Sequence, residues 1–191
     1  SGTITNPFTN KGEITNLNNN TSGTMNGLTN SSTGSIDNIT NEGNLAGTLT
    51  NESGGNIGTI TNNSDIDGID NTGTITNIDN SANITTITNQ NGGVITNIDN
   101  KANASITTFD NSGEVTNDFT NNGEIITLNN NATGSMNNLT NATNASIGTL
   151  TNEGTLNGGI TNETNAQIDD IINKATLDTI TNRGSINNKI T

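Results

Sequence analysis

The chain has 191 residues, of which 26% are hydrophobic and 2% aromatic, and it contains no Cys, His, Trp or Tyr. Its formal net charge of -13 argues against nucleic-acid binding, which needs a basic face, and against docking on anionic lipid. The lack of Cys excludes a disulfide framework and a thiolate metal site, and no apolar run is long enough for membrane insertion.

A short repeat runs through the whole sequence. The unit reads G-x-I-x-x-I-x-N and is followed by a spacer of one to four residues. It begins at Gly2 and returns as GEITNLNN at Gly12, GTITNIDN at Gly73 and GVITNIDN at Gly93, about nineteen times in all. The first position is Gly or a small substitute, and the units at Gly2, Gly43, Gly113 and Gly154 hold one extra residue between their apolar positions.

Each unit supplies two apolar residues and one Asn. The first apolar position runs Ile4, Ile14, Met25, Ile36, Leu45, Ile57, Ile66, Ile75, Ile84, Ile95, Ile106, Val115, Ile125, Met136, Ile147, Leu156, Ile168, Leu177, Ile186. The second runs Phe8, Leu17, Leu28, Ile39, Leu49, Ile60, Ile69, Ile78, Ile87, Ile98, Phe109, Phe119, Leu128, Leu139, Leu150, Ile160, Ile171, Ile180, Ile190. Two places later stand Asn10, Asn19, Asn30, Asn41, Asn51, Asn62, Asn71, Asn80, Asn89, Asn100, Asn111, Asn121, Asn130, Asn141, Asn152, Asn162, Asn173, Asn182.

This pattern predicts short parallel strands stacked into a β-solenoid. Gly and Asn in every copy give a poor helix propensity, and the apolar spacing does not fit a helix. Strand side chains alternate with period two, so the second apolar residue and the Asn share a face. The spacing of three between the apolar positions breaks this alternation, which predicts a strand, a bend, a second strand and a turn. Stacked copies then place Asn over Asn in a ladder of amide hydrogen bonds.

The spacers vary in length as turns do. The Gly that follows each spacer can adopt a positive φ, and Asn tolerates a positive φ better than most residues. One unit per turn of the coil would leave almost no interior. Two units give about twenty residues per turn and three give about thirty, and we expect two. A right-handed coil is the default because parallel crossovers favour that hand.

The sequence also contains a longer repeat, which is made of several short units. Residues 2–80 align without a gap with residues 113–191, a shift of 111 residues, and about half of the positions are identical. We therefore expect a single continuous solenoid over 1–191, with a first long repeat at 2–112 and a partial second copy at 113–191. Eleven units form one long repeat, so at two units per turn the second copy returns rotated by half a coil.

Several outward positions are candidate sites. Thr pairs flank inward Ile residues, a pattern that resembles β-helical antifreeze proteins, but Glu13, Asp37, Asp67 and Glu124 interrupt it. The Thr pairs are Thr3/Thr5, Thr59/Thr61, Thr74/Thr76, Thr86/Thr88 and Thr179/Thr181. Asp70, Asp79, Asp99 and Asp110 share the slot before the repeat Asn and point outward, where solvation explains them better than calcium binding. Glycosylation sequons begin at Asn20, Asn51, Asn131 and Asn141, among others.

Nothing in the sequence indicates catalysis or a cofactor. The chain lacks a His or Cys nucleophile and a basic cluster; Lys11, Lys101, Lys174 and Lys189 are isolated, and Arg183 is the only Arg. The adjacent Asp169 and Asp170 are expected to point to opposite faces of a strand. We therefore expect a protein without enzymatic activity, metal or cofactor.

Units such as GTITNIDN at Gly73 and GSIDNITN at Gly34 resemble the Asn/Thr-rich repeats of large bacterial surface proteins. These are the β-helical passenger regions of autotransporters, haemagglutinin-like adhesins and related giant repeat proteins. The resemblance covers the whole chain, rests on composition and period, and carries no site residue across. It implies parallel β-helix architecture, an extracellular or cell-surface location, and a role in reach or adhesion.

The leading hypothesis is a structural repeat region that forms a stalk or a self-stacking extracellular fibre. Solenoids need caps, and no stretch departs from the motif, so the expected partner is the chain itself, stacked end to end or continued in a longer protein. The alternatives are an adhesive passenger region that binds a glycan or a cell-surface ligand, and an ice-binding solenoid.

Overall fold

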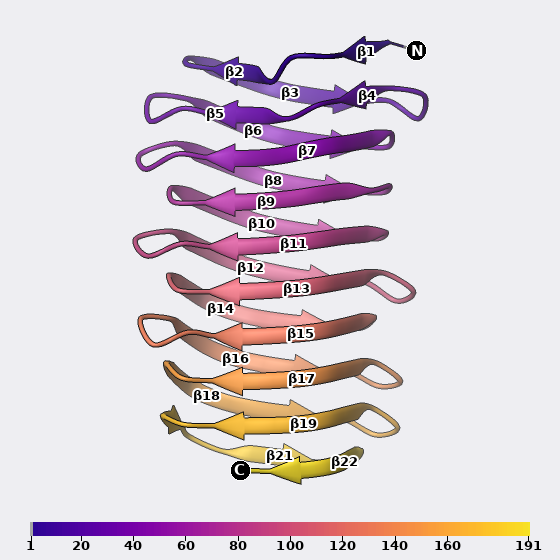
Figure 1. Ribbon diagram of the computed structural model, residues 1–191, viewed down its shortest axis with the longest axis vertical. Coiled ribbons are helices and arrows are strands. Elements are labelled where there is room, and N and C mark those ends of the chain that lie inside the picture. Colours follow the sequence, from indigo (N-terminus) through magenta and orange to yellow (C-terminus); the bar gives the residue numbers. More distant parts are fainter. Residues whose placement is uncertain (1) are drawn as a thin grey trace.

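The computed structural model describes residues 2–191 as a coil of parallel strands (Figure 1), and none of the described residues is helical. No helix in this range could therefore cross a membrane. The strands form two sheets, which we call sheet A and sheet B. The predicted all-β parallel solenoid is confirmed.

The two sheets alternate along the chain. Sheet A contains β1 (Thr3–Ile4), β2 (Phe8–Asn10), β4 (Thr24–Met25), β5 (Leu28–Asn30), β7 (Asn44–Asn51), β9 (Ile66–Asn71), β11 (Asn83–Asn89), β13 (Ser105–Asn111), β15 (Glu124–Asn130), β17 (Ser146–Asn152), β19 (Gln167–Asn173) and β22 (Ser185–Ile190). Sheet B contains β3 (Glu13–Asn19), β6 (Ser35–Asn41), β8 (Asn56–Asn62), β10 (Thr74–Asn80), β12 (Val94–Asn100), β14 (Glu114–Asn121), β16 (Ser135–Asn141), β18 (Thr155–Asn162), β20 (Thr176–Leu177) and β21 (Ile180–Asn182).

Each turn of the coil, which we call a rung, uses two repeat units. A strand inside the coil pairs with strands of the second unit before it and of the second unit after it, as β10 does with β8 and β12. The paired residues Ile75 and Ile95 lie one rung, twenty residues, apart, as predicted. In Figure 1 the near strands run to the left, the far strands run to the right, and the chain descends, which makes the coil right-handed.

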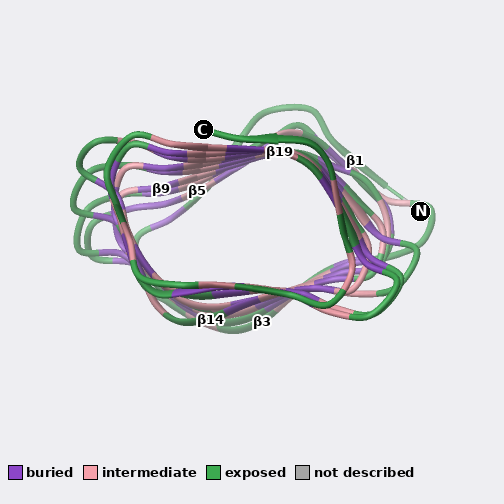
Figure 2. Cartoon of the chain, turned by 90° about the horizontal axis from the view of Figure 1, so that it is seen from below, coloured by how far each residue is buried: buried purple, intermediate pink, exposed green. Residues whose placement is uncertain are grey.

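The apolar core lies between the two sheets. The repeat places apolar residue over apolar residue, for example Ile78 over Ile98, and both are at most 1% exposed. Phe109 of sheet A and Phe119 of sheet B meet edge to face, with ring centroids 4.9 Å apart at 75°. Viewed along the axis, buried residues occur along the stacked strands and exposed residues gather at the turns that project from the two edges (Figure 2).

The expected bend between the apolar positions is wrong for most units. Only β1/β2, β4/β5 and β20/β21 are interrupted there, and elsewhere one strand of six to eight residues spans both positions. The alternation nevertheless shifts at the expected place. In β10, Ile75 and Asn77 have partners in β12, whereas Thr76 between them has none. The side chains of Thr76 and Asn77 both face outward, between the buried Ile75 and Ile78.

Within residues 2–191, the Gly after the spacer nowhere adopts the positive φ that it could. Positive φ values occur one residue earlier in five four-residue turns, at Gly54, Gly92, Asn103, Asn144 and Asn165. Each of these turns closes through a hydrogen bond from the amide of the fourth residue to the carbonyl of the first, such as Gly93 to Gln90 at 2.8 Å. The first-position Gly is instead required by space: a Cβ at Gly113 would collide with the carbonyl oxygens of Gly93 and Gln90.

The 111-residue repeat returns on the opposite sheet. Glu13–Asn19 forms β3 in sheet B, whereas its counterpart Glu124–Asn130 forms β15 in sheet A. Eleven units fill five and a half rungs, so a half-turn separates equivalent positions. Each outer face of the solenoid therefore carries residues from both copies of the long repeat.

Candidate functional site

The repeat Asn residues form two ladders inside the coil. One ladder follows the ends of the sheet A strands and comprises Asn10, Asn30, Asn51, Asn71, Asn89, Asn111, Asn130, Asn152 and Asn173. The other follows sheet B and comprises Asn19, Asn41, Asn62, Asn80, Asn100, Asn121, Asn141, Asn162 and Asn182. The sequence predicted both the residues and their stacking.

Each ladder amide is fully used in the middle of the stack. Asn100 donates from Nδ2 to Oδ1 of Asn121 at 2.8 Å and to the carbonyl oxygen of Glu124 at 3.1 Å. Its own Oδ1 accepts a hydrogen bond from Nδ2 of Asn80 at 2.8 Å. Asn100 is completely buried, and a buried amide is tolerated only when its polar groups are paired. The ladders thus tie every corner of the coil to the rung that follows.

Both ladders point the same way. In all sixteen Asn–Asn bonds, Nδ2 belongs to the earlier rung and Oδ1 to the later one. The side-chain amide dipoles are therefore aligned along the solenoid axis. The two directions along the axis are chemically different throughout the coil.

Hydrogen bonds that side chains donate between rungs on the outer surface run in the opposite direction. Asn38 donates to Asn16 one rung earlier at 3.2 Å, and Asn97 donates to Asn77 at 2.9 Å. Carboxylates of one rung likewise accept from side chains of the next, in Asp65–Asn83, Asp110–Asn129, Glu153–Lys174 and Glu163–Arg183. The sequence analysis missed this second set, although an acid followed one rung later by Asn, Gln, Lys or Arg is its signal.

The four outward aspartates do not all lie together. Asp79 and Asp99 are neighbours in register on β10 and β12, whereas Asp70 and Asp110 are separated by Thr88 of β11. Lys101 forms a hydrogen-bonded ion pair with Asp99 and lies 3.8 Å from Asp79. The hydrogen bond to Asp99 is the main cause that raises the pKa of Lys101 above its ordinary value of 10.5. Within residues 2–191 no group of three or more acidic side chains could hold a metal ion.

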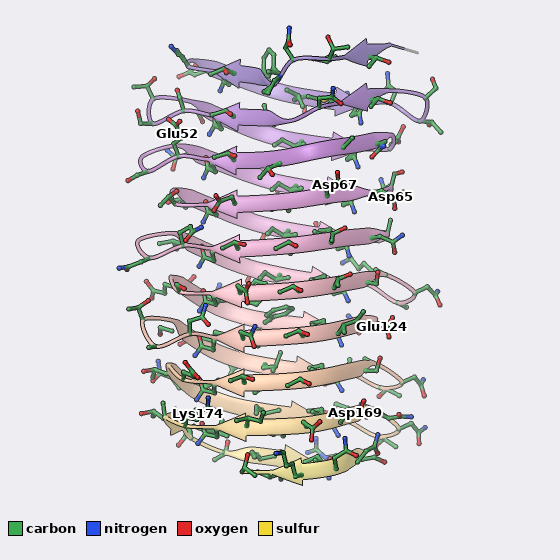
Figure 3. The ribbon with its side chains drawn as sticks, viewed as in Figure 1. Glu52, Asp65, Asp67, Glu124, Asp169 and Lys174 are labelled. Atoms are coloured by element: carbon green, nitrogen blue, oxygen red, sulfur yellow. The ribbon has the colours of Figure 1, made fainter. Side chains whose placement is uncertain are left out.

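Asp169 and Asp170 both face outward, which corrects the expectation of opposite faces. They occupy the two positions between inward Ile168 and Ile171, where the alternation shifts. Asp169 accepts a hydrogen bond from Asn187 at 2.7 Å, and Asp170 accepts one from Asn188 at 3.2 Å. Asp169 and the other labelled charged residues lie at scattered places on the outer surface in Figure 3.

The Thr pairs do not build a two-column lattice. In sheet A, Thr86, Thr108, Thr127 and Thr149 stand in register on four consecutive strands. The second column beside them contains Asp110 and Asn129 next to Thr108 and Thr127. Pairs such as Thr86/Thr88 in sheet A and Thr59/Thr61 in sheet B have no Thr pair on an adjacent rung of the same sheet. This arrangement gives little support to ice binding.

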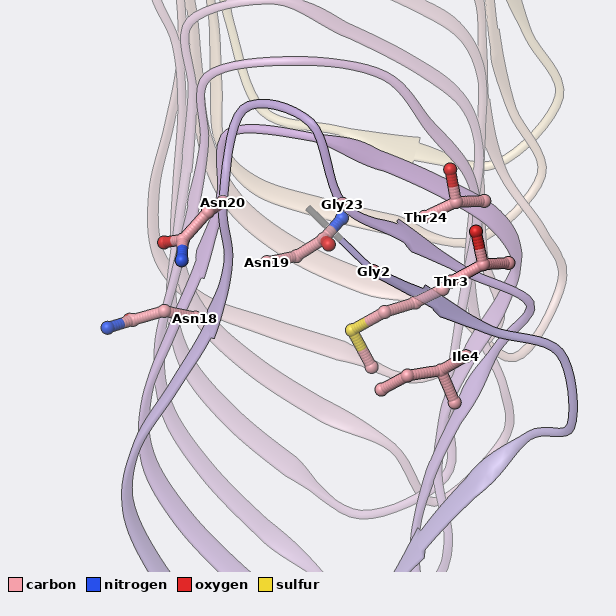
Figure 4. A pocket seen from close by; sticks show the side chains of 9 residues that line it. Gly2, Thr3, Ile4, Asn18, Asn19, Asn20, Gly23 and Thr24 are labelled. Carbon is pink, nitrogen blue, oxygen red and sulfur yellow. The ribbon is translucent and has the colours of Figure 1, made fainter.

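Several hollows indent the surface of the coil. The hollow in Figure 4 lies at the first two rungs, among Thr3, Ile4, Asn19 and Met25, and none of its lining residues is titratable. Two further hollows lie where a two-residue corner falls between four-residue turns of the rungs before and after it. Such turns project from both edges of the coil in Figure 1.

We call these two hollows the Glu114 notch and the Glu124 notch. The Glu114 notch lies between the turns at residues 90–93 and 131–134, and Asn91, Ser112 and Thr133 are among its lining residues. The Glu124 notch lies between the turns at 101–104 and 142–145, and its lining includes Asn103 and Asn144. Each notch has one carboxylate among neutral polar groups. Sequence reasoning missed the notches because they depend on which corners share an edge.

The sequons fall into two groups. Asn51 and Asn141 belong to the buried ladders, so a folded chain cannot present their amides to a glycosylating enzyme. Asn20 is exposed in a turn, and Asn131 is half-buried and donates to Oγ of Ser112 at 3.0 Å.

No protein-family model, curated protein or solved structure matches the chain.

Proposed function

We propose that the chain is a structural repeat region that supplies length and stiffness to a stalk or fibre outside a bacterial cell, without enzymatic activity. The observation that carries this proposal is the continuity of the interior. Backbone pairing in both sheets and both Asn ladders continue from rung to rung between residues 10 and 182. Each rung adds about 4.8 Å of length.

Resistance to proteolysis follows from the same arrangement. Most of the backbone is paired between strands, and only the corners project. Proteases need an extended, accessible segment, and exposed loop tips are the usual sites of cleavage. A coil whose exposed segments are turns of two to four residues suits an extracellular setting.

The proposed partner is another copy of the same coil, or further repeats of a longer chain. Ladder polarity restricts how such pieces join. Wherever the stack is interrupted, Oδ1 atoms face the side of the earlier rungs and Nδ2 atoms face the side of the later rungs, as the Asn100–Asn121 bond shows. Donor meets acceptor only in a head-to-tail contact, which is a heterologous interface that builds filaments.

Surface labelling and electron microscopy test the proposal. Antibodies against the chain should label intact source cells or material shed from them, and negative-stain images should show thin rods or fibres. Labelling that requires permeabilised cells would remove the extracellular assignment. Compact particles from the native material, with no rod or fibre, would remove the structural role.

The notches favour adhesion as a second candidate function. Carboxylate, amide and hydroxyl groups in the Glu124 notch could hydrogen-bond to sugar hydroxyls, since ligand sites combine a hollow with a few convergent polar groups. Binding on a glycan array that is lost in Glu124→Gln, and kept in a variant at an outward carboxylate elsewhere such as Asp37→Asn, would support it. Equal binding by both variants would contradict it.

A further inference from the structure

Four Asn–Gly pairs occur in the chain, at Asn26, Asn91, Asn122 and Asn157. In such a pair the backbone nitrogen of Gly can attack the side-chain carbonyl carbon of Asn. The attack requires a Gly N–H without a hydrogen-bond partner, a free Asn side chain and a backbone that can close a five-membered ring. Glycine favours the reaction because it has no Cβ.

Asn91–Gly92 alone meets all three conditions. The pair forms the tip of the turn at residues 90–93, and both residues are exposed. Among the described residues, neither the Gly92 N–H nor the Asn91 side chain has a hydrogen-bond partner. Gly92 has φ +88°, and a Cβ built on it would meet no atom within 4 Å. The hydrogen bond from Gly93 to Gln90 closes the turn beneath this pair and leaves the tip open to solvent.

The three other pairs are held by the fold. Asn122 donates to Asp99 at 3.0 Å, and the Gly123 N–H donates to Asn121 Oδ1 at 3.2 Å, so both reacting groups are occupied. Breaking two hydrogen bonds of ordinary strength lowers the population of the reactive geometry by about thirtyfold.

Asn26 donates to the carbonyl oxygen of Thr5 at 2.9 Å, and Gly27 is buried. Asn26 and Gly27 lie between β4 and β5, where the Asn26 N–H donates to Ile4 and the Gly27 carbonyl accepts from Phe8.

Asn157 and Gly158 lie inside β18 where its register shifts, between Leu156 and Gly159, which are both paired with β16. Gly158 packs against Oδ1 of Asn138. In both pairs a backbone held by hydrogen bonds must therefore move before the ring can close.

We propose that Asn91 is a self-modification site at which the chain deamidates with water as the only co-reactant. The Gly92 nitrogen loses its proton to solvent base and bonds to Cγ of Asn91. Nδ2 takes up a proton from solvent, the Cγ–Nδ2 bond breaks, and ammonia leaves. Water then opens the cyclic imide at one of its two carbonyl carbons, giving either an Asp or an isoaspartyl residue. No electron transfer is involved, and the net change is replacement of NH2 by OH.

The modification changes a defined surface. Asn91 and Gly92 line the Glu114 notch, which holds one carboxylate before the reaction and two after it. The isoaspartyl product also lengthens the backbone at the turn tip, where no neighbouring atom restricts Gly92. We expect the fold to survive because the Asn91 side chain belongs neither to the core nor to the ladders. The notch therefore gains negative charge as the protein ages.

Peptide mapping by mass spectrometry tests the assignment on the full chain. Folded protein is incubated at mildly alkaline pH beside protein in guanidinium chloride, and deamidation is followed at all four Asn–Gly pairs. In denaturant the four rates should agree within a few-fold. In the folded chain Asn91 should keep a rate close to its denatured value, whereas Asn122 should slow about thirtyfold.

Two variants make the result specific. Asn91→Gln should abolish the early product and leave circular dichroism unchanged. Asp99→Ala removes the acceptor of the Asn122 side chain, so it should accelerate Asn122 without affecting Asn91. The proposal is overturned if folded Asn91 reacts no faster than Asn122, or if Asn26 or Asn157 reacts first.

Discussion

At the scale of single residues, the repeated Asn solves the problem of a polar group inside a narrow coil. Its amide is both donor and acceptor, so one residue type can bond to its own copies above and below. Asp would lack the donor, and Leu would leave the corner carbonyls, such as that of Glu124, without a partner. This explains why the Asn position accepts no substitute along the chain, whereas the apolar positions hold Ile, Leu, Val, Met or Phe.

Replacement of a central ladder residue tests this role. Asn100→Ala removes three buried hydrogen bonds, namely those of Asn100 with Nδ2 of Asn80, with Oδ1 of Asn121 and with the carbonyl oxygen of Glu124. We expect the free energy of unfolding to fall by roughly 3–5 kcal/mol, measured by denaturant titration. The control is Asn97→Ala on the outer face of the same strand, with an expected loss of about 0.5 kcal/mol. Equal losses of unfolding free energy in the two variants would show that the ladder stabilises the fold no more than an outer hydrogen bond does.

The ion pair of Lys101 predicts a weak pH dependence. Its pKa is raised in the folded chain, so its contribution is complete below the ordinary value of 10.5 and is lost as the pH rises through the higher folded value. The Lys101 side chain is 43% exposed, so solvent screening limits the contribution to about 0.5 kcal/mol. Compared with Lys101→Ala, the stability difference should be constant from pH 7 to about pH 10 and shrink above 10.5. A stability difference that grows above pH 10.5 would contradict the upward shift of the Lys101 pKa.

At the scale of the element, each unit is one strand and one corner. The sequence was sufficient to predict which side chains face inward, because two apolar residues and one Asn recur with fixed spacing. It did not show that the strand runs through the shift at positions such as Thr76, because continuity depends on pairing with both neighbouring strands. Nor did it show which turn residue has the positive φ: Gly92 and Asn103 adopt it, whereas Gly113 is selected by the close approach of two carbonyl groups.

Single-residue insertions separate the tolerant part of a strand from the intolerant part. A Gly inserted between Asp99 and Asn100 would turn Asn100 outward, because side chains alternate with period two. We expect a loss of roughly 3 kcal/mol or more, from the broken ladder. A Gly inserted after Thr96 should cost much less, because the paired strand β14 already holds an extra residue between its apolar positions. Thermal unfolding of the two variants compares them directly, and the reverse order would contradict the assigned register.

At the scale of the whole molecule, the odd number of units in the long repeat determines which residues share an outer face. Equivalent strands such as β3 and β15 occupy opposite sheets, so the surface pattern of one long repeat reappears after a half-turn. The half-turn can be predicted from the sequence once two units per rung are assumed, because eleven units then fill five and a half rungs. The notches and the outer hydrogen bonds could not be predicted in the same way, because they depend on which corners and rotamers meet across rungs.

The length added per long repeat tests the central claim of a two-unit rung most directly. Tandem proteins with two, three and four copies of residues 2–112 would be measured by cryo-electron microscopy or small-angle scattering. The slope of length against copy number does not depend on the ends. Two units per rung predict an increase of about 26 Å per copy, with the surface pattern turned by half a coil. An increase of about 18 Å or about 53 Å per copy would mean three units or one unit per rung and would contradict the account.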